Sequence, residues 1–503
     1  MRSQEEENEQ MGMYDEDDNR LFKNTDTNGR FHSDWCSMMY SRLMLARNLL
    51  SEDGAIFISI DDNEQDSLKR ICDEVFGSGN FIGNIVWKRK RGRDNSARWL
   101  SKAHEYCLLY SKQKGCFEIG LLPLDDETKK AYRNPDNDSR GVYRMLGCWA
   151  RGTQGGVKYS FTTKDGQYFS ERLWLFSKEN LEKLDKENKL IIRGDNIYRK
   201  MFITENKGKI PETLWDDVSN AANAADEIKG LFGEIIFDTP KPIPYIKRML
   251  EIVPNKDSII LDFFSGSATT AQAVMAQNFQ DVFDGKPGKR KFIMVQLPEP
   301  CDEKSEAYKA GYKNICEIGK ERIRRAGELE YKNVFSTAGS SLRWNEEEKA
   351  KQGDKYVCPD DVDIGFRVLK LDSSNMKDVY YAADDYDQRN LMNMVSNIKE
   401  DRTDLDLLFG CLLDWGLPLS MPYQSEQIDD CTVHTYNDGD LIACFDPNVP
   451  ESVVKEIAKR KPLRAVFRDS SFANSPAKIN VFEIFKLYMP EDANDISKRV
   501  RVI

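Results

Sequence analysis

Two short apolar runs, far apart in the sequence, constrain this chain most, because each leads through a turn into a helical pattern. The first covers Ala55 to Ile60 and ends in Asp61 and Asp62, and the second covers Ser258 to Phe264. Strand-length apolar runs that alternate with helices are typical of an α/β fold with a parallel sheet. Because no apolar run approaches the ~18 residues that span a bilayer, we expect no membrane partner and a cytoplasmic location.

Helices and further strands are predicted around both runs. Apolar residues recur at helical spacing from Met39 to Leu50, after a possible cap at Ser33 or Asp34, and Gly54 follows them. A second helix is expected after the first run, and another after Lys241. The further predicted strands are Phe81 to Lys88, Glu105 to Tyr110 and Lys291 to Leu297.

Charge and cysteine content narrow the class of protein. The 73 basic and 84 acidic residues leave a net charge of −11, and the first twenty residues are strongly acidic, so residues 1–30 are predicted to be a solvated, flexible segment. The eleven cysteines include no Cys-x-x-Cys pair, and His32, His104 and His434 lie far apart. We therefore expect reduced thiols and no metal site, with structural roles for His32 and His104.

The turn after the second apolar run is a candidate binding site. A strand ends at Asp262 and passes through Gly266 into a helix, whose free N–H groups favour an anionic group of a ligand. Asp262 could accept a hydrogen bond from an ammonium group on the same ligand. The turn lacks both G-x-G-x-x-G and the Gly-Lys-Ser/Thr of a P-loop, which disfavours dinucleotides and nucleoside triphosphates. By itself, the glycine could serve only the geometry of the turn.

The order of motifs around this turn resembles a known family. Thr239-Pro240-Lys241-Pro242 and a helix precede the turn, and a strand running from Arg290 through Gln296 to Glu299 follows it. This order resembles the S-adenosylmethionine-binding half of the β-class amino-methyltransferases that act on DNA, and more closely the methylation subunits of type III restriction-modification systems. The resemblance also covers Asn28 to Trp35, Arg42-Leu43, Asp61 to Glu64 and Asp363 to Arg367.

The resemblance implies a fold, a cofactor and a division into domains. The fold would be α/β, with the Rossmann-like sheet of an S-adenosylmethionine-dependent methyltransferase, an inserted target-recognition domain and a C-terminal α+β domain. The implied segments are the catalytic-half portion 31–87, the target-recognition insert 88–238, the cofactor half 239–330 and a domain for dimer or partner contacts, 331–503. The implied cofactor residues are Lys241, Pro242, Asp262, Phe263, Phe264, Ser265, Gly266, Ser267, Thr269, Thr270 and Gln296.

Two positions in the cofactor half depart from the family pattern. Ala268 stands where a second glycine is common, and Gln296 stands where an acid usually holds the ribose hydroxyls. Because Gln can donate and accept hydrogen bonds, we expect weakened rather than lost cofactor binding.

The implied activity is methyl transfer from S-adenosylmethionine to adenine N6 in duplex DNA. The family uses Asp-Pro-Pro-Tyr to hold the flipped-out base, and neither this motif nor Asn-Pro-Pro-Tyr occurs in the sequence, so no catalytic residue is assigned. The motif's absence suggests an N-terminally shortened chain. A catalytically incomplete recognition and assembly subunit that needs a separate N-terminal fragment is the alternative, and a methyltransferase for RNA or small molecules would need a different substrate domain.

A basic segment opens the predicted insert. Seven basic residues surround a single acid, Asp94, and Trp87 and Trp99 are interleaved with them. The predicted DNA-binding residues are Lys88, Arg89, Lys90, Arg91, Arg93, Arg98 and Lys102. The segment could contact phosphates or be a solvated loop, and its place in the insert favours DNA. Trp149, Trp174 and Trp215 are expected to pack in the interior. The implied partners are duplex DNA, a second copy of the chain and a helicase-nuclease restriction subunit.

Overall fold

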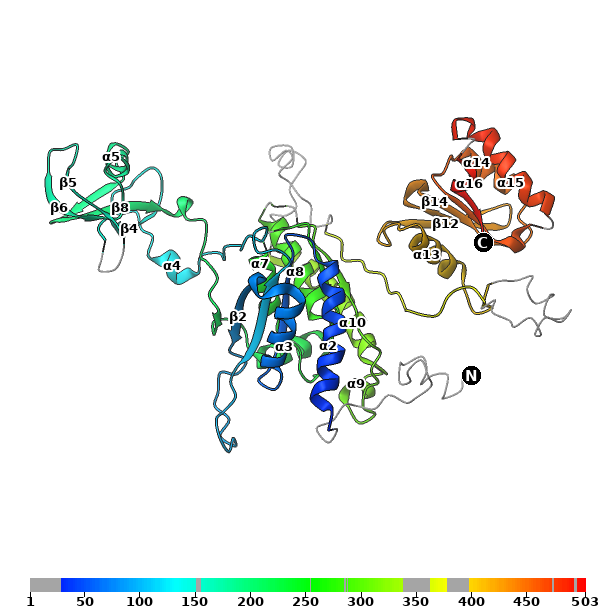
Figure 1. The fold of residues 1–503 in the computed structure, drawn as a ribbon, viewed down its shortest axis with the longest axis horizontal. Helices are drawn as coiled ribbons and strands as arrows, with labels where there is room; N and C mark the ends of the chain where they lie inside the picture. Colours follow the sequence, from blue (N-terminus) through cyan, green and yellow to red (C-terminus); the bar gives the residue numbers. More distant parts are fainter. Residues whose placement is uncertain are drawn as a thin grey trace. The chain divides into compact units, whose positions relative to one another are not determined.

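The computed structural model describes residues 29–150, 155–253, 255–284, 286, 288–337, 362–377, 398–472, 475–492 and 495–503. The chain divides into two compact units, Met1–Gly365 and Phe366–Ile503 (Figure 1). The predicted acidic segment lies almost entirely outside the described residues. The division falls later than the predicted boundary at 330/331, because helix α10 continues to Thr337 and Ile364 packs in a cluster with Tyr331.

The first sheet of unit 1 has the strand order β1-β3-β2-β9. These strands are β1 (Ala55–Ile60), β2 (Phe81–Trp87), β3 (Glu105–Ser111) and β9 (Leu214–Trp215). Both β1 and β2 pair antiparallel with β3, so the prediction of a purely parallel layer is wrong here. The strands β1 and β2 do point the same way, as their connecting helix suggested, but β3 runs back between them. The residues of β3 therefore complete the main sheet rather than belonging to a separate insert.

Two helices cover the first sheet, as their apolar spacing predicted. They are α2 (Phe31–Leu49) and α3 (Gln65–Cys72), and a π-helical turn, Asp73–Gly77, continues α3. Met39, Leu43 and Ala46 of α2 are buried in one cluster with Leu68 of α3 and Ile56 of β1. Trp35, near the start of α2, and Ile60, at the carboxyl end of β1, pack against the same cluster.

The second sheet of unit 1 contains two parallel strands, β10 (Ile259–Asp262) and β11 (Lys291–Met294). Both predicted strands are present, although each ends earlier than expected. The surrounding helices are α6 (Ala221–Phe232), α7 (Ile243–Ile252), α8 (Thr269–Phe283), α9 (Glu306–Lys309) and α10 (Ile315–Thr337). Helix α7 joins the two sheets, because Tyr245 packs against Trp87 of the first sheet while Leu250 packs in a cluster with Ile260 of the second.

The middle of the predicted insert has a small core of its own. Its elements are α4 (Asp126–Lys130), β4 (Tyr143–Gly147), β5 (Val157–Thr162), β6 (Tyr168–Trp174), α5 (Lys178–Lys186), β7 (Leu190–Arg193) and β8 (Asn196–Phe202). The strands form two antiparallel sheets, β4-β8-β7 and β5-β6. Trp174 is fully buried there, Trp149 packs against the same cluster, and Trp215 is buried in the main sheet, which confirms their packing roles.

Unit 2 is a mixed five-stranded sheet with helices on both faces. Its strands are β12 (Tyr423–Ile428), β13 (Cys431–Tyr436), β14 (Leu441–Cys444), β15 (Ala465–Phe467) and β16 (Val500–Val502), in that order across the sheet. Its helices are α13 (Asp404–Asp414), α14 (Glu451–Lys459), α15 (Ser475–Tyr488) and α16 (Ile496–Arg499). Alternate residues of β14 face opposite sides, with Leu441 and Ala443 in the cluster of α13, and Ile442 and Cys444 in that of α14 and α15.

Within the described part of the chain, no helix combines the length and apolarity needed to cross a membrane.

Candidate functional site

The turn between β10 and α8 adopts a backbone that few residues tolerate. Gly266 has φ +50°, and Ala268, directly before α8, has φ +59°. Ala268 therefore takes the left-handed conformation that a glycine would adopt at less cost. The Ala268 N–H donates to the Ser265 carbonyl at 2.7 Å, which closes the turn tightly.

Asp262 organises the turn from the end of β10. One carboxylate oxygen accepts a hydrogen bond from the Thr270 hydroxyl at 2.6 Å, and the other accepts from the Phe264 N–H at 3.3 Å. Asp262 itself is only partly buried, so its carboxylate retains acceptor capacity toward solvent or a ligand. Thr270, by contrast, is buried and directed at Asp262, which makes it a support for the carboxylate.

A buried arginine holds the start of α8. Arg322 of α10 is fully buried, and its Nη1 donates to the hydroxyls of Ser267 at 2.8 Å and Thr269 at 2.6 Å. Its Nε donates to Gln272 at 2.9 Å, while Nη2 has no hydrogen-bond partner among the described residues. Burial lowers the pKa of Arg322 to about 10, so the guanidinium remains charged at neutral pH. The charge of Glu227 acts in the opposite direction on this pKa.

The side chains of Ser267 and Thr269 therefore face the protein interior. Both residues are buried, and both hydroxyls bond to Arg322. They were predicted as cofactor residues, and in this arrangement a ligand would meet their backbone rather than their hydroxyls. No side chain in the described part of the chain caps α8 at Ala268, so the first N–H groups of the helix remain available to an anionic ligand group.

Gln296, which follows β11, holds the turn through a hydrogen bond. Its Oε1 accepts the Gly266 N–H at 2.7 Å, and its Nε2 donates to the Leu297 carbonyl at 3.2 Å. The sequence prediction assigned Gln296 to the ribose of a cofactor. In the structure this side chain fixes the position of Gly266, and its assignment to the ribose stays a prediction. Phe264, within the turn, is about half exposed (53%), and its ring lies 5.3 Å from the ring of Phe263 between centroids.

Lys241 belongs to a charge cluster on the first sheet. Its Nζ lies 2.5 Å from one oxygen of Glu105, and Nη1 of Arg89 lies 2.6 Å from the other. Lys241 also lies over the ring of Trp87, 5.3 Å from its centroid. Pro242 is buried at the start of α7. The structure thus ties the Lys241-Pro242 segment to the sheet through Glu105, a residue that no sequence motif had marked.

All the predicted basic residues of this segment are exposed except Arg89. Arg89 is partly buried and paired with Glu105, and Trp87 is only 1% exposed, so neither is a free surface group. Lys102 lies 3.6 Å from Asp62. The exposed members are Lys88, Lys90, Arg91, Arg93, Arg98 and Lys102. At the tip, Arg98 lies over the ring of Trp99, which is 83% exposed.

Sequence reasoning missed Arg322 and Glu105 for a physical reason. Each bonds to residues that are distant in the sequence. Arg322 donates a hydrogen bond to Ser267 in the turn, and Glu105 forms ion pairs with Lys241 and Arg89. A charged residue in an amphipathic helix or at the start of a strand usually faces solvent, so no local signal distinguished either one.

Comparisons with known proteins show which family the chain belongs to. A family model described as DNA methylase matches residues 8–328. The chain is 40% identical over 301 residues to the Mod subunit of the type III restriction-modification enzyme StyLTI from Salmonella typhimurium, covering 58% of this chain and 45% of that protein. It is 34% identical over 346 residues to the EcoPI Mod subunit of Escherichia phage P1, covering 61% and 52%. The chain thus spans about half the length of these two relatives.

The alignment with a third relative covers a larger share of that protein's length. The type II methyltransferase M.KpnI of Klebsiella pneumoniae is 32% identical over 333 residues, which cover 61% of this chain and 77% of that protein. The DNA methylase model covers the sheets β1-β3-β2-β9 and β10-β11 and the turn between β10 and α8. The predicted α/β methyltransferase fold is thereby confirmed for this unit, and the chain belongs to the DNA methylase family.

Proposed function

We propose that this chain is a site-specific DNA methyltransferase subunit that transfers a methyl group from S-adenosylmethionine to adenine N6 in duplex DNA, within a type III restriction-modification system. Support comes from its membership of the DNA methylase family and from its identity to two type III Mod subunits. Our proposal extends to a homodimer that works with a helicase-nuclease restriction subunit, with Phe366–Ile503 as the candidate contact unit.

The turn between Asp262 and Thr270 carries this proposal. S-adenosylmethionine bears an ammonium and a carboxylate on one carbon, and its sulfonium supplies an activated methyl group. The partly exposed Asp262 carboxylate suits the ammonium, and the uncapped N–H groups at the start of α8 suit the carboxylate. Arg322, Gln296 and Thr270 keep these groups in place before the ligand arrives, which reduces the ordering cost of binding.

The exposed part of the basic segment is our candidate DNA contact. Arg91 and Arg93 lie close together on an exposed stretch, and charge neutralisation of phosphates needs no buried support. Trp99 could stack on an unpaired base, because its ring is exposed and every base has a π-face. Such contacts would hold the duplex without reading its sequence.

Methyl transfer to DNA tests the proposed function directly. Purified chain is incubated with radiolabelled S-adenosylmethionine and duplex DNA, alone and with a separate fragment containing Asp-Pro-Pro-Tyr, and the digested nucleosides are separated. Label in N6-methyladenine in either arm supports the proposal. If calorimetry shows cofactor binding yet no label enters adenine in either arm, the proposed reaction is wrong. Label in cytosine would also overturn the assignment of adenine N6.

A further inference from the structure

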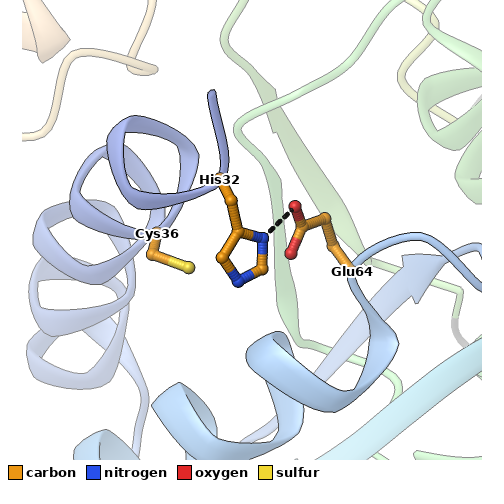
Figure 2. A group of neighbouring side chains, drawn as sticks. All are labelled: His32, Cys36 and Glu64. Carbon is orange, nitrogen blue, oxygen red and sulfur yellow. Dashed lines mark hydrogen bonds and ion pairs between the residues drawn. The ribbon is translucent and has the colours of Figure 1, made fainter. Parts of the chain in front are cut away.

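Three potential metal ligands meet where α2 begins and α3 begins. His32 and Cys36 are four residues apart on α2, so both lie on one face of that helix, one turn from each other. Glu64 directly precedes α3. Figure 2 shows the three side chains turned toward one another, and one potential ligand atom from each lies within 4.8 Å of the other two.

Internal hydrogen bonds leave part of this cluster unsatisfied. His32 Nδ1 lies 2.6 Å from Glu64 Oε1, and His32 Nε2 lies 3.2 Å from the Ser67 hydroxyl. Glu64 is 8% exposed, and its second oxygen, Oε2, is buried with no hydrogen-bond partner in the described part of the chain. A buried carboxylate oxygen without a partner is costly, and native proteins seldom leave one without a reason.

We propose that His32, Cys36 and Glu64 form a binding site for a divalent transition-metal ion, with Zn²⁺ as the best fit. Imidazole nitrogen, thiolate sulfur and carboxylate oxygen are the three ligand types that zinc takes in proteins. Magnesium and calcium prefer all-oxygen sites, so the cysteine and histidine disfavour both. With three ligands from the protein, a water molecule completes the tetrahedron.

The geometry needs only a small adjustment to bind the ion. Ligand bonds to zinc of about 2.0–2.3 Å place neighbouring ligand atoms roughly 3.5 Å apart, somewhat closer than the 4.8 Å limit that contains the three atoms here. The His32 side chain is 62% exposed, so its ring can rotate without disturbing the core. Ser67 could then hold the ring nitrogen that does not bind the ion.

The Cys36 thiol must lose its proton before it can bind a metal ion. Burial, and next the nearby Glu64 charge, raise the pKa of the Cys36 thiol. Without metal the thiol therefore keeps its proton at neutral pH, and binding of the ion releases it. The metal would join the start of α2 to the start of α3, far along the chain from the cofactor turn. The proposal uses no residue of the cofactor turn.

Cobalt provides a direct test, because Co²⁺ bound to a thiolate absorbs in the near ultraviolet. The full chain is titrated with Co²⁺ and then with Zn²⁺ against a chromophoric chelator, for wild type, Cys36→Ser, Glu64→Gln and His32→Asn. We expect a thiolate–cobalt band in wild type that Zn²⁺ displaces and that Cys36→Ser abolishes. Each variant should weaken zinc binding by more than about 100-fold, since removing a group that only supports a metal ligand already costs 10- to 100-fold.

Cys116→Ser is the matched control, because Cys116 is exposed and belongs to neither group of potential metal ligands. It should keep the cobalt band, the zinc affinity and the rise in melting temperature on zinc addition that Cys36→Ser lacks. A band of full intensity in Cys36→Ser would overturn the proposal and move the metal elsewhere, for example to the group of Cys431, Cys444 and Asp446 in unit 2. Unchanged zinc affinity in both Glu64→Gln and His32→Asn would overturn it equally.

Discussion

The turn Asp262–Thr270 and the basic segment Lys88–Lys102 are both candidate contact regions, and they are built in opposite ways. In the turn, Ser267, Thr269 and Thr270 are buried, and their hydroxyls bond to Arg322 or Asp262. Most basic side chains of the segment are instead exposed. A small ligand needs groups at fixed positions, which requires a buried support. A polyanion needs only a local excess of positive charge, which an exposed segment supplies without support.

We expect the largest effect from removing the buried support. Arg322→Ala deprives Ser267 and Thr269 of a charged donor and should lower the free energy of unfolding of unit 1 by about 2–4 kcal/mol. Urea unfolding of the full chain measures this loss. The control is Arg324→Ala, two residues along α10, whose side chain is 55% exposed and which should cost less than about 0.5 kcal/mol. Equal midpoints for the two variants would mean that Arg322 does not support the turn.

Asp262→Ala should have the next largest effect, on cofactor binding. Losing a charged acceptor for the ammonium group should weaken S-adenosylmethionine binding by about 1.5–3 kcal/mol in calorimetry. Asp257→Ala is the control, because Asp257 is an exposed acid at the other end of β10. Unchanged affinity in a folded Asp262→Ala variant would remove this turn as the cofactor site.

The salt dependence of DNA binding should distinguish the exposed arginines of the basic segment from the paired Arg89. Replacing Arg91 and Arg93 with Ala should weaken binding to all duplex sequences alike. It should also reduce the slope of log affinity against log salt by about 0.9 for each phosphate that the variant no longer neutralises. Arg89→Ala should leave that slope nearly unchanged, because Arg89 is paired with Glu105. If Arg89→Ala changes the slope as much as the other two together, its ion pair must open when DNA binds.

The smallest effect concerns the tip of the basic segment. Trp99→Ala should change the free energy of unfolding by less than about 0.5 kcal/mol, because the ring is 83% exposed. The fully buried Trp174, replaced in the same way, should cost about 3–5 kcal/mol. A large loss of stability in Trp99→Ala would show that this tip packs against the protein in solution, contrary to its exposure.

Local sequence signals predicted the individual elements well. Helix α2, strands β1, β2, β3, β10 and β11, and the turn into α8 are all present near the predicted positions. Strands β10 and β11 end earlier than expected, and α2 begins at Phe31, before the predicted cap at Ser33 or Asp34. The elements themselves could be predicted because these signals depend on residues within one or two turns of each other. The same locality explains why Trp174 and Trp215 could be assigned to the interior.

Interactions between segments distant in the sequence determined the strand order and the side-chain contacts of the site. Only the folded sheet places antiparallel β3 between β1 and β2, directs Gln296 at Gly266, and pairs Arg89 with Glu105. The meeting of His32, Cys36 and Glu64 depends equally on how α2 packs beside α3. The spacing of apolar residues along a helix or strand determines which face of that element is buried. Which other element packs against that face depends on the packing of the whole core, and a local sequence pattern does not contain this information.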